Sequence, residues 1–229
     1  VVDLLKNFYN KDSEYIHNRV LETIDEFGLS RSDIYGYETY GCESSKSLDE
    51  YNKHKYFELR KAYNDNPDWI KFYTLITCSF SNQIRFNSKG KFNMPYGKRY
   101  YNKSLQEKLK IFVGEMHKKD IQFQNKDFRE CKFFSDCFIY VDPPYLNSTA
   151  TYNENGGWSK NDEKDLLNML DIVDRNGRFA LSNNLKYDNP YLEEWKNKYN
   201  VHYLNGDYSN CNYQKKDKSK DCEILITNY

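Results

Sequence analysis

The 229-residue chain contains 34 Lys plus Arg and 34 Asp plus Glu, so its net charge is zero and favours no class of partner. Aromatic residues make up 17% of the chain, which excludes a disordered protein because disordered chains are poor in aromatics. No apolar run approaches membrane-spanning length, the cysteines form no C-x-x-C pair, and the histidines show no metal spacing. We therefore expect a reduced, cytoplasmic protein that binds no membrane and no metal.

The chain before about residue 80 is predicted to be helical. A charged, tyrosine-rich stretch at 48–63 predicts a helix with one covered face. Asn66-Pro67 predicts the N-cap and first residue of the next helix, whose apolar residues recur from Trp69 to Phe80. From 79 to 101 the composition changes to Asn, Gly, Pro, aromatic and basic residues, which is typical of a hairpin or an ordered loop.

After residue 101 the pattern alternates between helix and strand. Ser104-x-x-Glu107 and Ser159-x-x-Asp162 each predict a capped helix start. Short apolar runs predict strands at Ile121–Gln124, Phe138–Val141, Phe179–Ser182, Val201–Leu204 and Ile224–Thr227. Strands that alternate with helices indicate an α/β layered core.

Asp142-Pro143-Pro144-Tyr145 is the motif most suggestive of chemistry. It directly follows the apolar run at 138–141, and open α/β folds place their sites at the carboxyl ends of strands. Two prolines remove two N–H donors and leave a rigid turn that presents acceptors, namely the Asp142 carboxylate and carbonyl oxygens, followed by the Tyr145 ring. These groups suit the exocyclic amine of a flat base. A purely structural turn is the alternative.

The same motif is similar to the catalytic motif of amino-group DNA methyltransferases, and its leading Asp is typical of adenine N6 enzymes. Upstream, residues 82–97 resemble the R-[FY]-N-x-x-G-x-[FY]-N-x-P-[FY]-G signature of Dam and related adenine methylases, the D12 class. The resemblance covers nearly the whole chain. It implies a Rossmann-like methyltransferase core with a mostly helical DNA-recognition insertion that carries a β-hairpin. The expected division is 1–12 and 102–229 for the core and 13–101 for the insertion.

The resemblance also implies roles for particular residues. Asp142, Pro143, Pro144 and Tyr145 would hold an adenine flipped out of duplex DNA while it accepts a methyl group from S-adenosylmethionine. Residues expected to meet that donor are Asp127, Phe128 and Asp142. Residues expected to contact DNA are Arg85, Asn87, Lys89, Lys98, Arg99, Lys215 and Lys216. Among them Arg85 matches the family's guanine-reading arginine, because arginine pairs in a bidentate manner with guanine O6 and N7. Solvated loops are the alternative for the lysine-rich runs.

One family feature is missing from this sequence. The F-x-G-x-G-like loop and the acidic residue that hold the donor in the family have no counterpart here. We therefore expect a core that is incomplete at its N-terminal side, with three accounts open: a truncated product, one part of a split methyltransferase completed by a partner chain, or a non-catalytic DNA-binding remnant. The resemblance makes GATC the first expectation for the target site, and a restriction–modification system is the expected setting.

Overall fold

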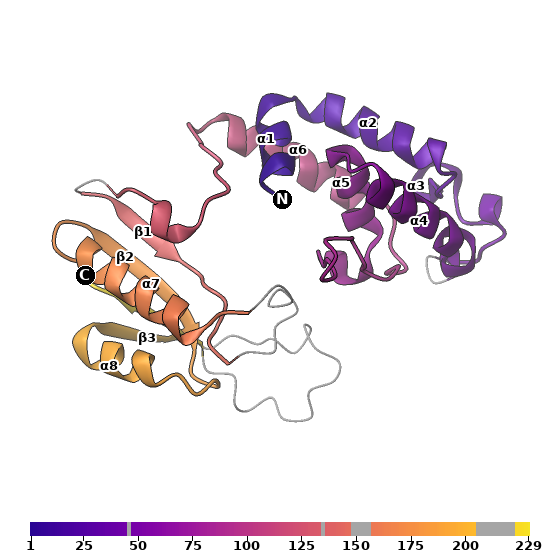
Figure 1. The fold of residues 1–229 in the computed structure, drawn as a ribbon. Helices are drawn as coiled ribbons and strands as arrows, with labels where there is room; N and C mark the ends of the chain where they lie inside the picture. Colours follow the sequence, from indigo (N-terminus) through magenta and orange to yellow (C-terminus); the bar gives the residue numbers. More distant parts are fainter. Residues whose placement is uncertain (45–46, 134–135, 148–156, 205–222) are drawn as a thin grey trace. The chain divides into compact units, whose positions relative to one another are not determined.

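The computed structural model describes residues 1–44, 47–133, 136–147, 157–204 and 223–229. They form two compact units, Val1–Asn125 and Lys126–Tyr229, which are described separately. Figure 1 shows the helical first unit and the sheet of the second. Lys215 and Lys216, two of the residues expected to contact DNA, lie outside the described residues.

The first unit is built from helices around one apolar core. α5 (Trp69–Cys78) is the central helix and contacts α1 (Val2–Asn10), α2 (Ser13–Glu26) and α4 (Leu48–Asp65). Residues around the whole of α5 are buried, as expected for a helix covered on several sides. The remaining helices of this unit are α3 (Ser32–Tyr35), α6 (Lys103–His117) and the short 3₁₀ turns η1 (Glu38–Tyr40) and η2 (Phe80–Asn82).

Two predicted helix starts were each wrong by two residues. Asp68, rather than Asn66, caps α5, because its carboxylate accepts hydrogen bonds from the N–H groups of two residues in the first turn. Asn66 instead ends α4. Asn102 caps α6 through a bond from the Leu105 N–H, which places Ser104 inside the helix. In each case the Asp or Asn directly before the helix satisfies the free N–H groups.

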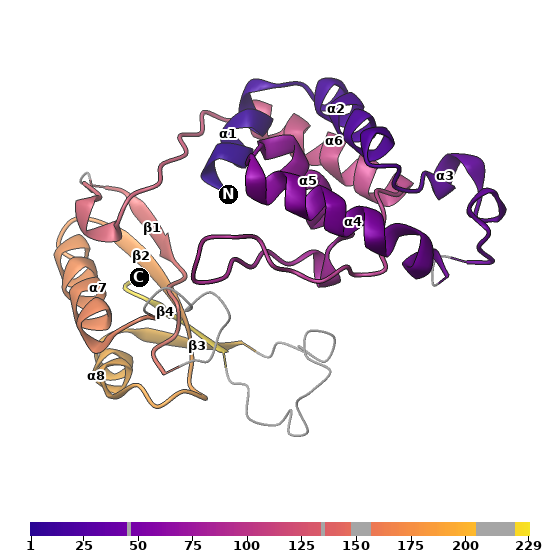
Figure 2. The same cartoon turned by 45° about the vertical axis from the view of Figure 1, so that its right-hand side comes forward.

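The α5–α6 loop, residues 79–102, is a hairpin-like excursion without a continuous ladder. Two isolated antiparallel bridges, Ser79↔Tyr96 and Phe86↔Phe92, replace regular strands. Figure 2 shows this loop running beside α4 and α5.

Side chains of α4 hold the main chain of this loop. The Asn64 amide pairs with both the N–H and the carbonyl of Phe92, at 2.8 and 3.0 Å. The Tyr56 hydroxyl and Arg60 Nη1 donate to the carbonyl of Met94, each at 2.9 Å. These contacts replace the ladder that a hairpin partner would supply.

The second unit contains a four-stranded mixed sheet of order β1-β2-β4-β3. The strands are β1 (Phe138–Val141), β2 (Arg178–Asn184), β3 (Asn200–Leu204) and β4 (Glu223–Thr227), at the positions predicted. β1 and β2 are parallel, whereas β4 is antiparallel to both β2 and β3. α7 (Lys160–Val173) and α8 (Pro190–Lys198) lie on one face of the sheet (Figure 2) and bury an apolar cluster that includes Phe179 and Leu181. The predicted capping box Ser159/Asp162 begins α7.

Three features differ from expectation. Residues 121–124 form no strand, since none of the described strands pairs with them in a ladder. β1 was predicted to be buried, but among the described strands it pairs only with β2 and leaves Phe138 and Tyr140 57% and 60% exposed. α6 was assigned to the catalytic core, yet its apolar face, with Leu109 and Val113, packs into the helical unit.

Candidate functional site

The Asp142 motif lies at the carboxyl edge of the sheet. Val141 pairs with Leu181 in the parallel ladder, so the next residues outward on the two strands are Asp142 and Ser182. Asp142 is exposed, and Pro143 behind it is buried. The prolines follow a paired strand directly, which fixes the turn and presents the carboxylate at the edge where α/β folds bind ligands.

The aromatic residue of the motif has a partner that the sequence did not reveal. The rings of Tyr145 and Tyr187 lie 6.1 Å apart at 41°, and both residues are half-buried. The loop after β2, which carries Tyr187, also accepts a hydrogen bond from the Asn147 side chain at the Asp188 carbonyl, at 2.6 Å. The motif is therefore fastened to the neighbouring loop at two points.

Electrostatics keep the Asp142 carboxyl easier to protonate than an ordinary aspartate. Partial desolvation is the main cause of a raised pKa, and the negative charge of Glu223 adds to it. On the neighbouring strand, Asn183 near the end of β2 is buried. Its Oδ1 accepts from the Asn184 N–H, and its Nδ2 has no hydrogen-bond partner among the described residues. The carboxyl edge of the sheet thus contains a carboxylate acceptor and a buried amide donor.

The expected donor residues lie in the short 3₁₀ turn η3 (Phe128–Glu130) and its cap. The Asp127 carboxylate accepts from the backbone and guanidinium of Arg129, and this interaction lowers the Asp127 pKa. Arg129 also donates to Asp162 at 2.6 Å and to Asp165 at 2.7 Å, two carboxylates of α7. Its role was not predicted, because its partners come from a distant part of the sequence.

A buried carboxylate supports the same region. Glu163 is fully buried and accepts from Trp158 Nε1 at 2.5 Å and Asn189 Nδ2 at 2.7 Å. The Trp158 ring in turn lies 5.6 Å from the Phe128 ring. Glu163 therefore connects the start of α7, the cap of α8 and the aromatic wall at Phe128. An open cavity of about 620 Å³ adjoins Phe128 and α7 but includes no residue of the Asp142 motif.

Arg85, the predicted guanine reader, is held within the α5–α6 loop. Its Nε donates to Asn93 Oδ1 at 2.7 Å, and its Nη2 donates to the Asn93 carbonyl at 2.9 Å. A guanidinium has five N–H donors, so these two bonds leave the Nη1 donors and one donor of Nη2 for another acceptor.

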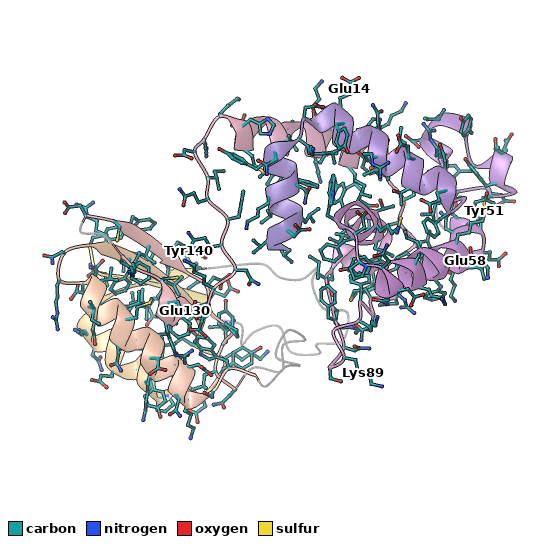
Figure 3. The ribbon with its side chains drawn as sticks, turned by 45° about the horizontal axis from the view of Figure 1, so that its top comes forward. Glu14, Tyr51, Glu58, Lys89, Glu130 and Tyr140 are labelled. Carbon is teal, nitrogen blue, oxygen red and sulfur yellow. The ribbon has the colours of Figure 1, made fainter. Side chains whose placement is uncertain are left out.

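The other predicted DNA-contacting residues of this loop have distinct environments. Lys89 is exposed at the tip of the loop (Figure 3). Asn87 shapes that tip, because its side-chain oxygen accepts from the N–H groups of Lys89 and Lys91. Lys98 pairs with Asp49 at 3.2 Å while remaining mostly exposed, and Arg99 is exposed. The loop therefore presents basic side chains on a turn fixed by Asn87.

Metal-ligand clusters and membrane-spanning helices are absent from the described residues. No group of three or more His, Cys, Asp or Glu side chains in that part of the chain is arranged to hold a metal ion. No helix there is both long and apolar enough to cross a membrane.

Comparison with known proteins places the chain in a family. Residues 3–210 match the D12 class of N6 adenine-specific DNA methyltransferases, and the chain belongs to this family. Methyltransferases of this class depend on S-adenosylmethionine. The resemblance drawn from the Asp142 motif and the Arg85 signature is thereby confirmed at the level of the family.

Individual relatives refine the picture. The chain is 33% identical over its whole length to the type II methyltransferase M.FokI of Planomicrobium okeanokoites. It is 31% identical over 99% of its length to the modification methylase StsI of Streptococcus sanguinis. The DNA adenine methylase of Escherichia coli is 21% identical over 85% of the chain. The chain spans 34% of the first two relatives, and their greater similarity leaves the GATC expectation unsupported.

The residues present suit only part of a methyl-donor site. Phe128 and Trp158 offer an aromatic face, and Asp127 and Asp142 offer carboxylates. The sequence has no glycine loop of the kind that lets S-adenosylmethionine approach the backbone closely.

Proposed function

We propose that this chain carries the target-adenine site of a DNA N6-adenine methyltransferase. The observation that supports it most is the Asp142-Pro143-Pro144-Tyr145 turn at the carboxyl end of β1, in a chain of the D12 family. No residue of the proposed site needs to form a covalent bond with the base. Its task is to hold an amine in the geometry and electronic state in which it attacks a methyl group.

Asp142 and Pro143 act on the adenine N6 amine. Its lone pair is delocalised into the ring, so the nitrogen is a weak nucleophile. The Asp142 carboxylate accepts one amine hydrogen and the Pro143 carbonyl accepts the other, which draws the hydrogens from the ring plane and restores lone-pair character. S-adenosylmethionine, when bound, would supply the methyl group from its sulfonium, whose S–CH3 bond breaks with the electron pair left on sulfur. As N6 gains the methyl group it loses one proton, which Asp142 is positioned to accept.

Tyr145 stacks on the flipped base, and Tyr187 supports the Tyr145 ring from the neighbouring loop. Aromatic stacking holds a flat base whatever its identity, so this pair contributes binding and orientation of the base. The base must leave the duplex, since its amine is otherwise inaccessible to the motif.

The donor is proposed to meet the chain at Asp127, Phe128 and Asp142. We further propose that a strand from outside these 229 residues pairs with β1 and brings the glycine loop. The unpaired edge of β1 among the described strands and the exposure of Phe138 and Tyr140 support this completion. A DNA-binding remnant that never methylates is the second candidate, favoured by the missing glycine pattern.

The helical unit is proposed to read duplex DNA, with Arg85 on a guanine and Lys89, Lys98 and Arg99 on phosphates. Lys215 and Lys216 would add phosphate contacts from outside the described residues. Asn87 is proposed to act by shaping the loop tip. A restriction–modification role is proposed from the names of the relatives at 31–33% identity. No target sequence is proposed from the Dam resemblance; the target sequence is to be measured.

The test is a methyl-transfer assay with the whole chain, radiolabelled S-adenosylmethionine and unmethylated duplex DNA, followed by nucleoside analysis. Label in N6-methyladenine that disappears in Asp142→Asn supports the proposal. Label in a methylated cytosine would refute it. Calorimetry with the donor separates the two candidates. A chain that binds the duplex but neither binds the donor nor methylates DNA needs the glycine loop to be supplied. If methylation is still absent after the glycine loop is supplied, the chain is a DNA-binding remnant.

A further inference from the structure

We propose that Asn93 is a specificity-positioning residue, which fixes the edge of the Arg85 guanidinium that faces DNA. The inference rests on the proposed function, in which Arg85 reads a guanine. It assigns the discrimination at that base pair to two residues: one that contacts the base and one that orients the contact.

Three hydrogen bonds join the two residues across the α5–α6 loop. The Asn93 N–H donates to the Arg85 carbonyl at 3.0 Å, which sets the two main chains side by side. Arg85 Nε then donates to Asn93 Oδ1 and Nη2 donates to the Asn93 carbonyl. Asn93 thereby occupies the lateral edge of the guanidinium, formed by Nε and Nη2.

The edge left over suits guanine. It carries one N–H of Nη1 and one of Nη2, which are parallel and lie in the guanidinium plane. Guanine presents O6 and N7 as two acceptors side by side in the major groove, so this edge can pair with both. A guanidinium free to rotate would also offer its lateral edge or a single N–H to a phosphate, and those contacts carry no sequence information.

Asn93 is not required to anchor the loop itself. Its neighbours Phe92 and Met94 are 1% and 3% exposed, and their main-chain groups are bonded by Asn64 and Tyr56 of α4. The Asn93 side chain is half-buried and accepts a hydrogen bond from Arg85. Replacing it should leave the loop in place, so its effect on recognition can be measured in a folded protein.

The choice of Asn also has an electrostatic consequence. A neutral amide oxygen orients the guanidinium without cancelling its charge, so attraction to the phosphates is preserved. A carboxylate at the same position would accept the same N–H while lowering that attraction. Asn93→Asp therefore separates orientation from charge.

The test measures sequence selection by the whole chain. Wild type and variants are mixed with duplexes that carry a randomised core, and the bound fraction is sequenced. A bidentate arginine–guanine pair favours its base by roughly 5- to 150-fold. Asn93→Ala is expected to lose about tenfold of the preference for one guanine, the same one that Arg85→Ala loses. Asn93→Asp is expected to keep that preference with weaker overall binding. Lys89→Ala, the control, should weaken binding to all sequences alike.

Each other outcome overturns a defined statement. If Asn93→Ala keeps the guanine preference that Arg85→Ala loses, the positioning role is wrong while the proposed function stands. If Arg85→Ala also keeps it, or if the wild-type chain selects no sequence, the proposed recognition role itself is wrong and the inference fails with it. Circular dichroism of each variant verifies that the helical unit is folded.

Discussion

Gly97 lies where the two sides of the α5–α6 loop come closest. A Cβ added there would stand 2.3 Å from the Ser79 carbonyl oxygen and 2.5 Å from the Phe80 nitrogen. Real Cβ contacts are essentially never below 3.0 Å, so the carbonyl would have to withdraw by at least 0.7 Å, the difference between 3.0 and 2.3 Å. Both obstacles are backbone atoms, which no side-chain rotation can move. We therefore predict that Gly97→Ala forces the loop away from the end of α5.

The cost has two parts. Two backbone bonds close this approach, Gly97 N–H to the Cys78 carbonyl at 2.9 Å and Phe80 N–H to the Pro95 carbonyl at 3.0 Å. Losing both costs about 1–3 kcal/mol, and overpacking adds about 1–3 kcal/mol, so the helical unit should lose about 2–6 kcal/mol of unfolding free energy. This is a large share of the roughly 5–15 kcal/mol that stabilises a typical domain.

Urea unfolding followed by far-UV circular dichroism measures this loss, because helices of the first unit contribute most of the signal. Gly114→Ala is the matched control. Gly114 lies inside α6 with no atom within 4 Å of an added Cβ, so the same substitution should stabilise the unit by about 0.5–1 kcal/mol. A Gly97→Ala free energy within about 0.5 kcal/mol of wild type would refute the steric argument.

Three further predictions concern single side chains. In the assembly that methylates DNA, protonation of Asp142 should lower the methylation rate at acid pH. Because its pKa is raised, this fall should begin at a higher pH than for an ordinary aspartate. Glu223→Gln removes a like charge and should move the acid limb of the pH–rate profile to lower pH. Glu163→Ala strands the buried Asn189 amide and should cost the second unit about 1–3 kcal/mol in urea unfolding followed by tryptophan fluorescence, and an unchanged midpoint would contradict this. Tyr56→Phe should cost only about 0.5–1.5 kcal/mol, since the carbonyl that it bonds keeps a second donor; a loss several times larger in the circular-dichroism assay would show another role for the hydroxyl.

The sequence predicted those features that depend on local patterns. Strands β1 to β4 and helices α4 and α7 follow from runs of apolar residues and from the Ser159/Asp162 box, which need no distant partner to be recognised. The Asp142 motif was placed correctly after its strand for the same reason.

Contacts between distant segments could not be predicted in this way. Tyr187 meets Tyr145, and Arg129 meets α7, only because the chain folds back over several tens of residues. The burial of β1 was overestimated, since an apolar run does not reveal how many neighbours a strand has. The predicted 121–124 strand shows the same limit, because a strand exists only with a partner to pair with.

The proposed division of roles between Arg85 and Asn93 could not be predicted from the sequence either. The family resemblance identified the arginine, but the sequence gave no sign that its lateral edge is already bonded. Eight positions separate the two residues, and only the narrow loop brings them together.

The anchoring of the α5–α6 loop bears on how such proteins diversify. The α4 side chains of Asn64, Tyr56 and Arg60 grip peptide groups of the loop rather than its side chains. Peptide groups are common to every residue, so mutations at the exposed tip can exchange one set of base contacts for another while the hydrogen bonds from α4 to the loop main chain are kept. A lineage under pressure to acquire new target sequences could therefore explore them through this loop without passing through unfolded intermediates.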